Sequence, residues 1–184
     1  MSRLRFGPVA ALLIAFASVA AADDKGTLVG IDGLSSKTPG EWKEVQTDGQ
    51  MRVKQFTLPK AAGDKSDAEL IIYFFGTGGG GGVKANVDRW KGQFQPPEGK
   101  KIDDVTKVEE FKVGSVPVTY VDVQGTYLFK ARPMDSRVEP RPNHRMLAVV
   151  FESPKGPYYF KLVGPEKTVE QHKKGFDEWL KNFK

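Results

Sequence analysis

Cysteine is absent from the 184 residues, and histidine occurs only twice. The lack of cysteine excludes a disulfide scaffold, a thiolate metal site, a cysteine nucleophile and a lipid-anchored bacterial lipoprotein. The two histidines, His144 and His172, show no spacing typical of zinc ligands, and no Gly-x-Ser-x-Gly nucleophile motif is present. The sequence therefore indicates no metal centre and no recognisable set of catalytic residues.

A strong excess of one charge is also missing, because the formal net charge is only +5. Nucleic-acid-binding domains carry a clustered basic excess, so we expect no nucleic-acid partner. Hydrophobic residues make up 39% of the chain and aromatic residues 11%. These fractions are typical of one globular domain and too high for a disordered chain.

The first residues have the pattern of a secretory signal peptide. Arg3 and Arg5 give a positive start, residues 8–20 are apolar, and residues 20–22 are three alanines followed by Asp23. A retained membrane anchor is the alternative, but a spanning helix needs about 20 apolar residues and this stretch is shorter. We expect a signal peptide over residues 1–22 with cleavage near Ala22. A single domain over 23–184, with no further transmembrane segment, would then be secreted or periplasmic.

Hydrophobic periodicity in the rest of the chain predicts strands in hairpins and two helices. The near-continuous apolar run 68–75 is predicted to lie at the centre of the sheet. The order of strands, helix, four strands and helix favours an α+β domain with a mainly antiparallel sheet of about six to seven strands, covered by two helices. The predicted strands are 42–45, 51–58, 68–75, 105–111, 116–129, 145–151 and 158–163, and the predicted helices are 83–94 and a last one from about Glu166.

Two segments are predicted to be irregular. Residues 23–41 are polar and rich in glycine, proline and serine, which indicates a loosely held start of the domain. Residues 130–144 contain Pro133, Pro140 and Pro142, which indicates a long loop.

Residues 76–82 include a five-glycine run and satisfy the pattern G-x-G-x-x-G between a predicted strand and a predicted helix. Such a run matches many glycine patterns by chance, no βαβ repeat follows, and Val83 stands where a phosphate-binding loop needs lysine. We therefore expect no nucleotide and no other cofactor. A flexible connector is the simpler interpretation, and a weak anion contact at Gly78, Gly79 and Gly80 is the functional one.

On the helix that follows, Asn86, Arg89 and Gln93 share one face beside Trp90. They form either a polar binding stripe or the solvated side of an amphipathic helix, and the second interpretation is favoured because solvated helix faces are the rule. Under the first interpretation these residues and the glycines line a cleft for a small ligand or anion, or for an enzymatic reaction.

The basic residues are unevenly distributed, because residues 130–184 carry 12 basic and 7 acidic residues. The excess centres on Lys130, Arg132, Arg137, Arg141 and Arg145, in the predicted loop. A long basic loop suits an acidic protein or an anionic envelope surface, and a solvated surface loop is the alternative.

Several short motifs give the sequence a family resemblance. Residues 73–76, 86–90, 93–94, 125–127 and 164–169 together resemble a group of uncharacterised secreted bacterial proteins typical of planctomycetes. The order of elements also resembles the PsbP-like α/β/α sandwich. That second resemblance implies a non-catalytic accessory or binding module. We expect an exported, non-catalytic binding or accessory domain of unknown partner, with the small-ligand, anion or enzyme cleft as the alternative.

Overall fold

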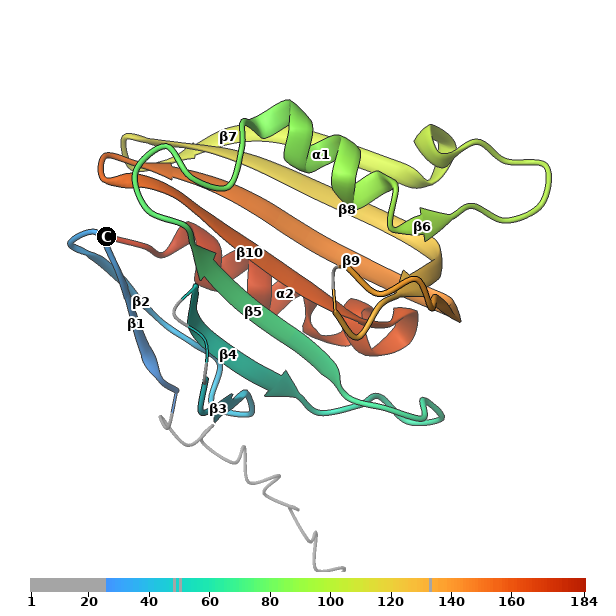
Figure 1. Cartoon of the computed structure of the whole chain (residues 1–184). Helices are drawn as coiled ribbons and strands as arrows, with labels where there is room; N and C mark the ends of the chain where they lie inside the picture. Colours follow the sequence, from blue (N-terminus) through green and yellow to red (C-terminus); the bar gives the residue numbers. More distant parts are fainter. Residues whose placement is uncertain (1–25, 48, 50, 133) are drawn as a thin grey trace, which may run out of the picture.

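The computed structural model describes residues 26–47, 49, 51–132 and 134–184, so the expected signal peptide lies outside the described residues. Within these residues the chain forms one small hairpin and one large antiparallel sheet (Figure 1). The large sheet has the order β3-β4-β5-β10-β9-β8-β6, and β7 also pairs with β8. The strands are β1 (Leu28–Ile31), β2 (Leu34–Lys37), β3 (Lys43–Val45), β4 (Arg52–Leu58), β5 (Ala68–Phe74), β6 (Phe94–Gln95), β7 (Thr106–Val113), β8 (Val116–Phe129), β9 (Glu139–Ser153) and β10 (Gly156–Pro165).

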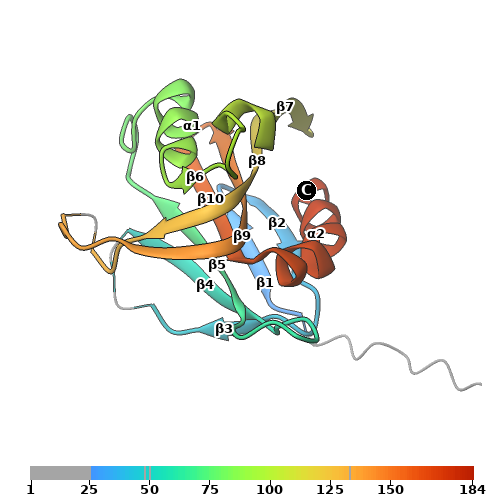
Figure 2. The ribbon, with the colours of Figure 1, turned by 90° about the vertical axis from the view of Figure 1, so that its right-hand side faces the viewer.

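Two helices cover opposite faces of this sheet, as Figure 2 shows. Helix α1 (Val83–Lys91) packs on one face and α2 (Glu166–Lys181) on the other, and a short 3₁₀ helix spans Ile102–Val105. The predicted α+β class with a mainly antiparallel sheet and two covering helices is confirmed. The sheet has eight strands, which is slightly more than the sequence predicted.

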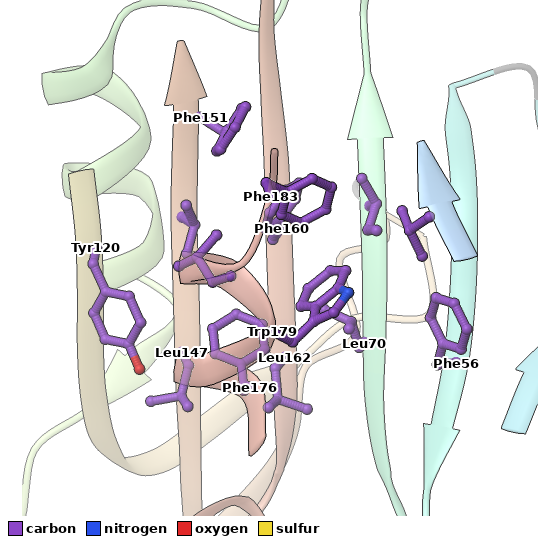
Figure 3. Packing of buried hydrophobic residues seen from close by; sticks show 14 of the residues in the cluster. Phe56, Leu70, Tyr120, Leu147, Phe151, Phe160, Leu162, Phe176, Trp179 and Phe183 are labelled. Carbon is purple, nitrogen blue, oxygen red and sulfur yellow. The ribbon is translucent and has the colours of Figure 1, made fainter. Parts of the chain in front are cut away.

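The larger core lies between the sheet and α2 (Figure 3). Alternate residues of the central strands point to this face, including Phe160 and Leu162 of β10. The apolar stripe of α2 meets them, with Trp179 and Phe160 ring centroids 5.6 Å apart. Helix α2 begins where Asp64, from the β4–β5 connection, accepts hydrogen bonds from the amide and the hydroxyl of Thr168.

The smaller core lies on the α1 face and is built from the other alternate residues. Tyr159 of β10, Ala148 and Val150 of β9, and Trp90 of α1 are buried there. Because α1 has only 9 residues, this core is smaller than the one under α2. The same face also carries the polar side chains described below.

The prediction of an irregular segment over 130–144 was wrong for its second half, because β9 already begins at Glu139. Residues 139–141 pair only with β8, while the pairing of β9 with β10 reaches no further than His144. Pro140 and Pro142 therefore lie on a strand section that has one free edge, where the missing N–H of proline is tolerated.

The prediction of a loosely held segment over 23–41 was also wrong for residues 26–41, the part that the structure describes. Val29 and Ile31 of β1 are fully buried in the larger core, and Trp42 follows them. The hairpin turns at Asp32 and Gly33, which both have positive φ. Asp-Gly is the preferred pair for such a turn, so this was a readable hairpin signal.

Two further predictions need correction. The central strand of the sheet order is β10, and β5 is its neighbour. Helix α1 ends at Lys91 instead of at Phe94, because Phe94 and Gln95 form β6 against β8. Phe94 keeps its predicted place in the core.

Candidate functional site

The glycine-rich segment between β5 and α1 is held by two buried side chains. The Asn86 amide donates to the carbonyls of Gly80, Gly81 and Gly82, and the Tyr159 hydroxyl donates to the Gly81 carbonyl at 2.8 Å. Gly80 has a φ of +80°, and a Cβ on it would lie 2.5 Å from the Tyr159 ring. The close contact with Tyr159 therefore explains why position 80 is a glycine. The anion contact at Gly78, Gly79 and Gly80 stays a prediction.

The polar stripe of α1 faces the sheet at two of its three positions. Asn86 is fully buried, Gln93 is half-buried beyond the end of the helix, and only Arg89 is exposed. The Arg89 guanidinium donates to the Asn86 side-chain oxygen. The favoured interpretation of a wholly solvated face was therefore wrong for Asn86 and Gln93.

Gln93 contacts Lys161, a residue that was not among the predicted ligand contacts. Lys161 stands in the middle of β10, on the α1 face, opposite Ile71 of β5 and Ala148 of β9. Its ammonium donates to the Gln93 side-chain oxygen and to the Tyr127 hydroxyl, each at 2.9 Å. In the described part of the chain, Lys161 forms no ion pair with a carboxylate.

The surroundings disfavour charge on Lys161. Burial, and to a smaller extent the nearby Arg89 guanidinium, lower the pKa of Lys161 to about 8, although Glu69 opposes this effect. The Glu69 carboxylate instead accepts a hydrogen bond from the Gln55 amide of β4 at 2.7 Å. An isolated ammonium in a half-buried position is costly, which is why its charged form is disfavoured here.

Aromatic rings form one wall beside Lys161. The Tyr127 ring stacks on His144, with centroids 6.3 Å apart and an interplanar angle of 18°. Burial raises the pKa of Tyr127 to about 12, so its hydroxyl keeps its hydrogen at neutral pH. Burial lowers the pKa of His144, so the neutral imidazole is favoured there. The Lys161 ammonium, the Tyr127 hydroxyl and the Gln93 amide thus meet on the α1 face, and we call these three residues the Lys161 site.

The four arginines predicted to bind a partner fall into two groups. Arg145 forms ion pairs with Asp122 and Glu170, and Arg141 pairs with Glu139 and stacks on the Phe129 ring at 3.6 Å. Arg132 and Arg137 are exposed, and neither side chain forms an ion pair within the described residues. They belong to the connection between β8 and β9, which projects from the body of the molecule (Figure 2).

The described residues also form a surface hollow, but neither a metal-binding cluster nor a membrane-spanning helix. A shallow hollow of about 380 Å³ opens beside Val83 of α1, against Phe111 and Pro117 of the β7–β8 hairpin. In the described ranges, no group of three or more histidine, aspartate or glutamate residues is placed to hold a metal ion. No helix among the described residues is long and apolar enough to cross a membrane.

Comparison with known proteins shows similarity at the level of the fold. No family model and no curated protein sequence matches this chain. The solution structure of cyanobacterial PsbP (CyanoP) from Synechocystis sp. PCC 6803 has a TM-score of 0.51 and 13% identity, over 94% of this chain and 98% of that chain. A protein of unknown function from Pseudomonas aeruginosa, PA94, has a TM-score of 0.46 and 12% identity, over 85% of this chain and 94% of its own.

The likeness to CyanoP confirms the expected resemblance to the PsbP-like sandwich. At 13% identity it shows the fold alone. No finding bears on the resemblance to planctomycete-type secreted proteins, which stays a prediction. This chain therefore has a PsbP-like α+β fold.

Proposed function

We propose that this chain is an exported, non-catalytic binding domain that docks on an acidic protein through the tip of the β8–β9 hairpin. We define the hairpin tip as residues 130–132 and 134–138. The observation that carries the proposal is the pair of exposed guanidinium groups of Arg132 and Arg137, which form no ion pair within the described residues.

The hairpin tip combines positive charge with apolar surface. Met134 is 95% exposed and Val138 is 39% exposed, beside the two arginines. Protein interfaces are enriched in methionine and arginine, and loops carried on a rigid sheet are common binding elements. The tip is carried by the two longest strands of the sheet, β8 and β9. Such a surface suits a partner that offers carboxylates around a small apolar patch.

Arg141 and Arg145 support this surface without belonging to it. Their guanidinium groups are already paired with Glu139, Asp122 and Glu170. The side chains of Arg145 and Asp122 are each only 14% exposed, so their ion pair fastens β9 to β8 below the tip. The binding role that the sequence suggested for four arginines is therefore proposed here for Arg132 and Arg137.

The test measures binding of the purified domain to fluorescent poly-L-glutamate by anisotropy. Arg132→Glu combined with Arg137→Glu should weaken binding roughly tenfold, because exposed ion pairs contribute up to about 1 kcal/mol each. The matched control is Lys112→Glu combined with Lys184→Glu, which makes the same change in charge away from the tip. Equal loss in both double variants contradicts the proposal, because binding then follows net charge alone.

A second arm distinguishes an acidic protein from a membrane surface. Vesicles containing phosphatidylglycerol replace poly-L-glutamate at the same ionic strength. Binding to poly-L-glutamate that depends on Arg132 and Arg137, with weaker binding to vesicles, supports the proposal. Binding to vesicles alone overturns it in favour of the envelope surface.

A further inference from the structure

The α1 face of the sheet carries an ammonium group that has no counter-ion among the described residues, and this feature is independent of the hairpin tip. Lys161 is half-buried in the central strand β10. Its two hydrogen-bond partners, the Gln93 side-chain oxygen and the Tyr127 hydroxyl, are both neutral. A buried charge is normally paired, because removing it from water is otherwise expensive.

Two hydrogens at the Lys161 site have no acceptor among the described residues. The ammonium has three hydrogens and uses two, for Gln93 and Tyr127. The Tyr127 hydroxyl accepts from Lys161, so its own hydrogen remains to be donated. The two donor atoms are 2.9 Å apart. Two adjacent donors of this kind match the two oxygens of one carboxylate.

The charges around the site also favour a negative ligand. The charge of Arg89, from α1, lowers the pKa of Lys161, and the charge of Arg141, from β9, lowers the pKa of Tyr127. Glu69, from β5, is the acidic group that raises the pKa of both. The Glu69 carboxylate is bound to the Gln55 amide and forms no ion pair with Lys161. Because Arg141 is already paired with Glu139, Lys161, Arg89 and Glu69 together leave one net positive charge, which a monoanion neutralises.

We propose that Lys161, Tyr127 and Gln93 form a binding site for the carboxylate of a small organic acid. The Lys161 ammonium supplies the charge and one hydrogen bond, and the Tyr127 hydroxyl supplies the second hydrogen bond. Gln93, two residues after the end of α1, orients the ammonium. The rings of Tyr127 and His144 lie beside the site and offer apolar surface to the rest of the ligand.

The test follows backbone amide signals of the full domain by NMR at pH 7, during titration with sodium acetate at constant ionic strength. Saturable shifts at residues 93, 127 and 161 are expected. Lys161→Met should reduce affinity at least tenfold. Gln93→Glu places a carboxylate on the ammonium as an internal counter-ion and should cause the same loss while the fold is kept. Gln171→Glu, an exposed position on α2, is the matched control and should bind as the parent does.

Three outcomes overturn the proposal. The first is that acetate produces no saturable shift at these residues. The second is that Gln93→Glu binds acetate as tightly as Gln171→Glu does. In a parallel arm, sodium phosphate binds more tightly than acetate, which assigns the site to phosphate compounds instead of carboxylates. None of these results affects the binding test of the hairpin tip, because the two sets of variants share no residue.

Discussion

The burial of the single residue Lys161 makes the stability of the fold depend on pH. Its pKa of about 8 in the folded protein lies below its ordinary value of 10.5. The unfolded chain therefore binds more protons than the folded one between these pH values, and stability rises with pH across that window. The charged groups that face Lys161 are Glu69 from β5 and Arg89 from α1, while Tyr127 from β8 has its pKa raised to about 12.

Urea unfolding at pH 7 and at pH 9.5 measures this effect. Between these two pH values, Lys161 should raise the free energy of unfolding by about 2 kcal/mol, because each pKa unit corresponds to about 1.4 kcal/mol. Lys161→Met should remove that rise, while Lys174→Met on the surface of α2 should leave it unchanged. A rise that persists in Lys161→Met contradicts the account of its burial.

Asn86 is the residue that fixes the glycine-rich segment. Asn86 is fully buried and its amide donates to three carbonyls, so Asn86→Ala removes these hydrogen bonds and leaves a small cavity. We expect a loss of about 2 kcal/mol in the free energy of unfolding, measured by urea denaturation. Gln171→Ala, an exposed helical control, should change it by less than about 0.5 kcal/mol. An equally small change in Asn86→Ala would show that the segment is held by other contacts.

At the scale of elements, α2 depends on a residue far away in sequence. Asp64 accepts two hydrogen bonds from Thr168 in the first turn of the helix. A carboxylate there also interacts favourably with the helix dipole. Asp64→Ala should therefore lower the free energy of unfolding by about 1 to 2 kcal/mol, whereas Asp67→Ala, in the same connection, should have a smaller effect. Equal effects of the two variants in thermal unfolding would count against this cap.

The elements that the sequence predicted well are those with long regular patterns. The apolar stripe of α2 and the hairpins β7–β8 and β9–β10 follow directly from periodicity and turn residues. The β1–β2 hairpin was missed because its strands have only four residues each. The start of β9 could not be predicted, because prolines indicate an irregular segment, whereas a strand section with a free edge accepts them.

The Lys161 site shows why function was harder to predict than structure. Asn86, Arg89 and Gln93 were recognised as one stripe, but their contacts depend on which residues of β10 lie beneath α1. A lysine within the apolar run 158–163 was a readable signal, because charged side chains are rarely buried unless they are paired. The partner Tyr127 comes from β8, and no local pattern connects it with Lys161.

At the scale of the whole molecule, export is a prediction that protein chemistry can check directly. The pattern of residues 1–22 predicts cleavage before Asp23. Mass spectrometry of the intact protein, expressed with its full sequence in a Gram-negative host, should find a periplasmic chain that begins at Asp23. A chain that keeps Met1 and stays in the cytoplasm would contradict the expected signal peptide.

The whole fold places its two proposed binding surfaces on one rigid sheet. The large core under α2 supplies most of the buried apolar surface, and the face under the shorter α1 carries the polar side chains. Strands β8 and β9 connect both surfaces, since β8 holds Tyr127 and leads into the hairpin tip. The α2 face thus carries the larger core, and the α1 face carries the polar groups that we propose to bind a carboxylate.

In the proposed carboxylate site, Lys161 has no counter-ion among the described residues until a ligand supplies one. NMR titration of the Lys161 side-chain nitrogen measures this directly in the folded protein. We expect a pKa near 8 for Lys161 in the free domain, and this pKa should rise when acetate saturates the site. A pKa near the ordinary value of 10.5 in the free domain, unchanged by acetate, would contradict it.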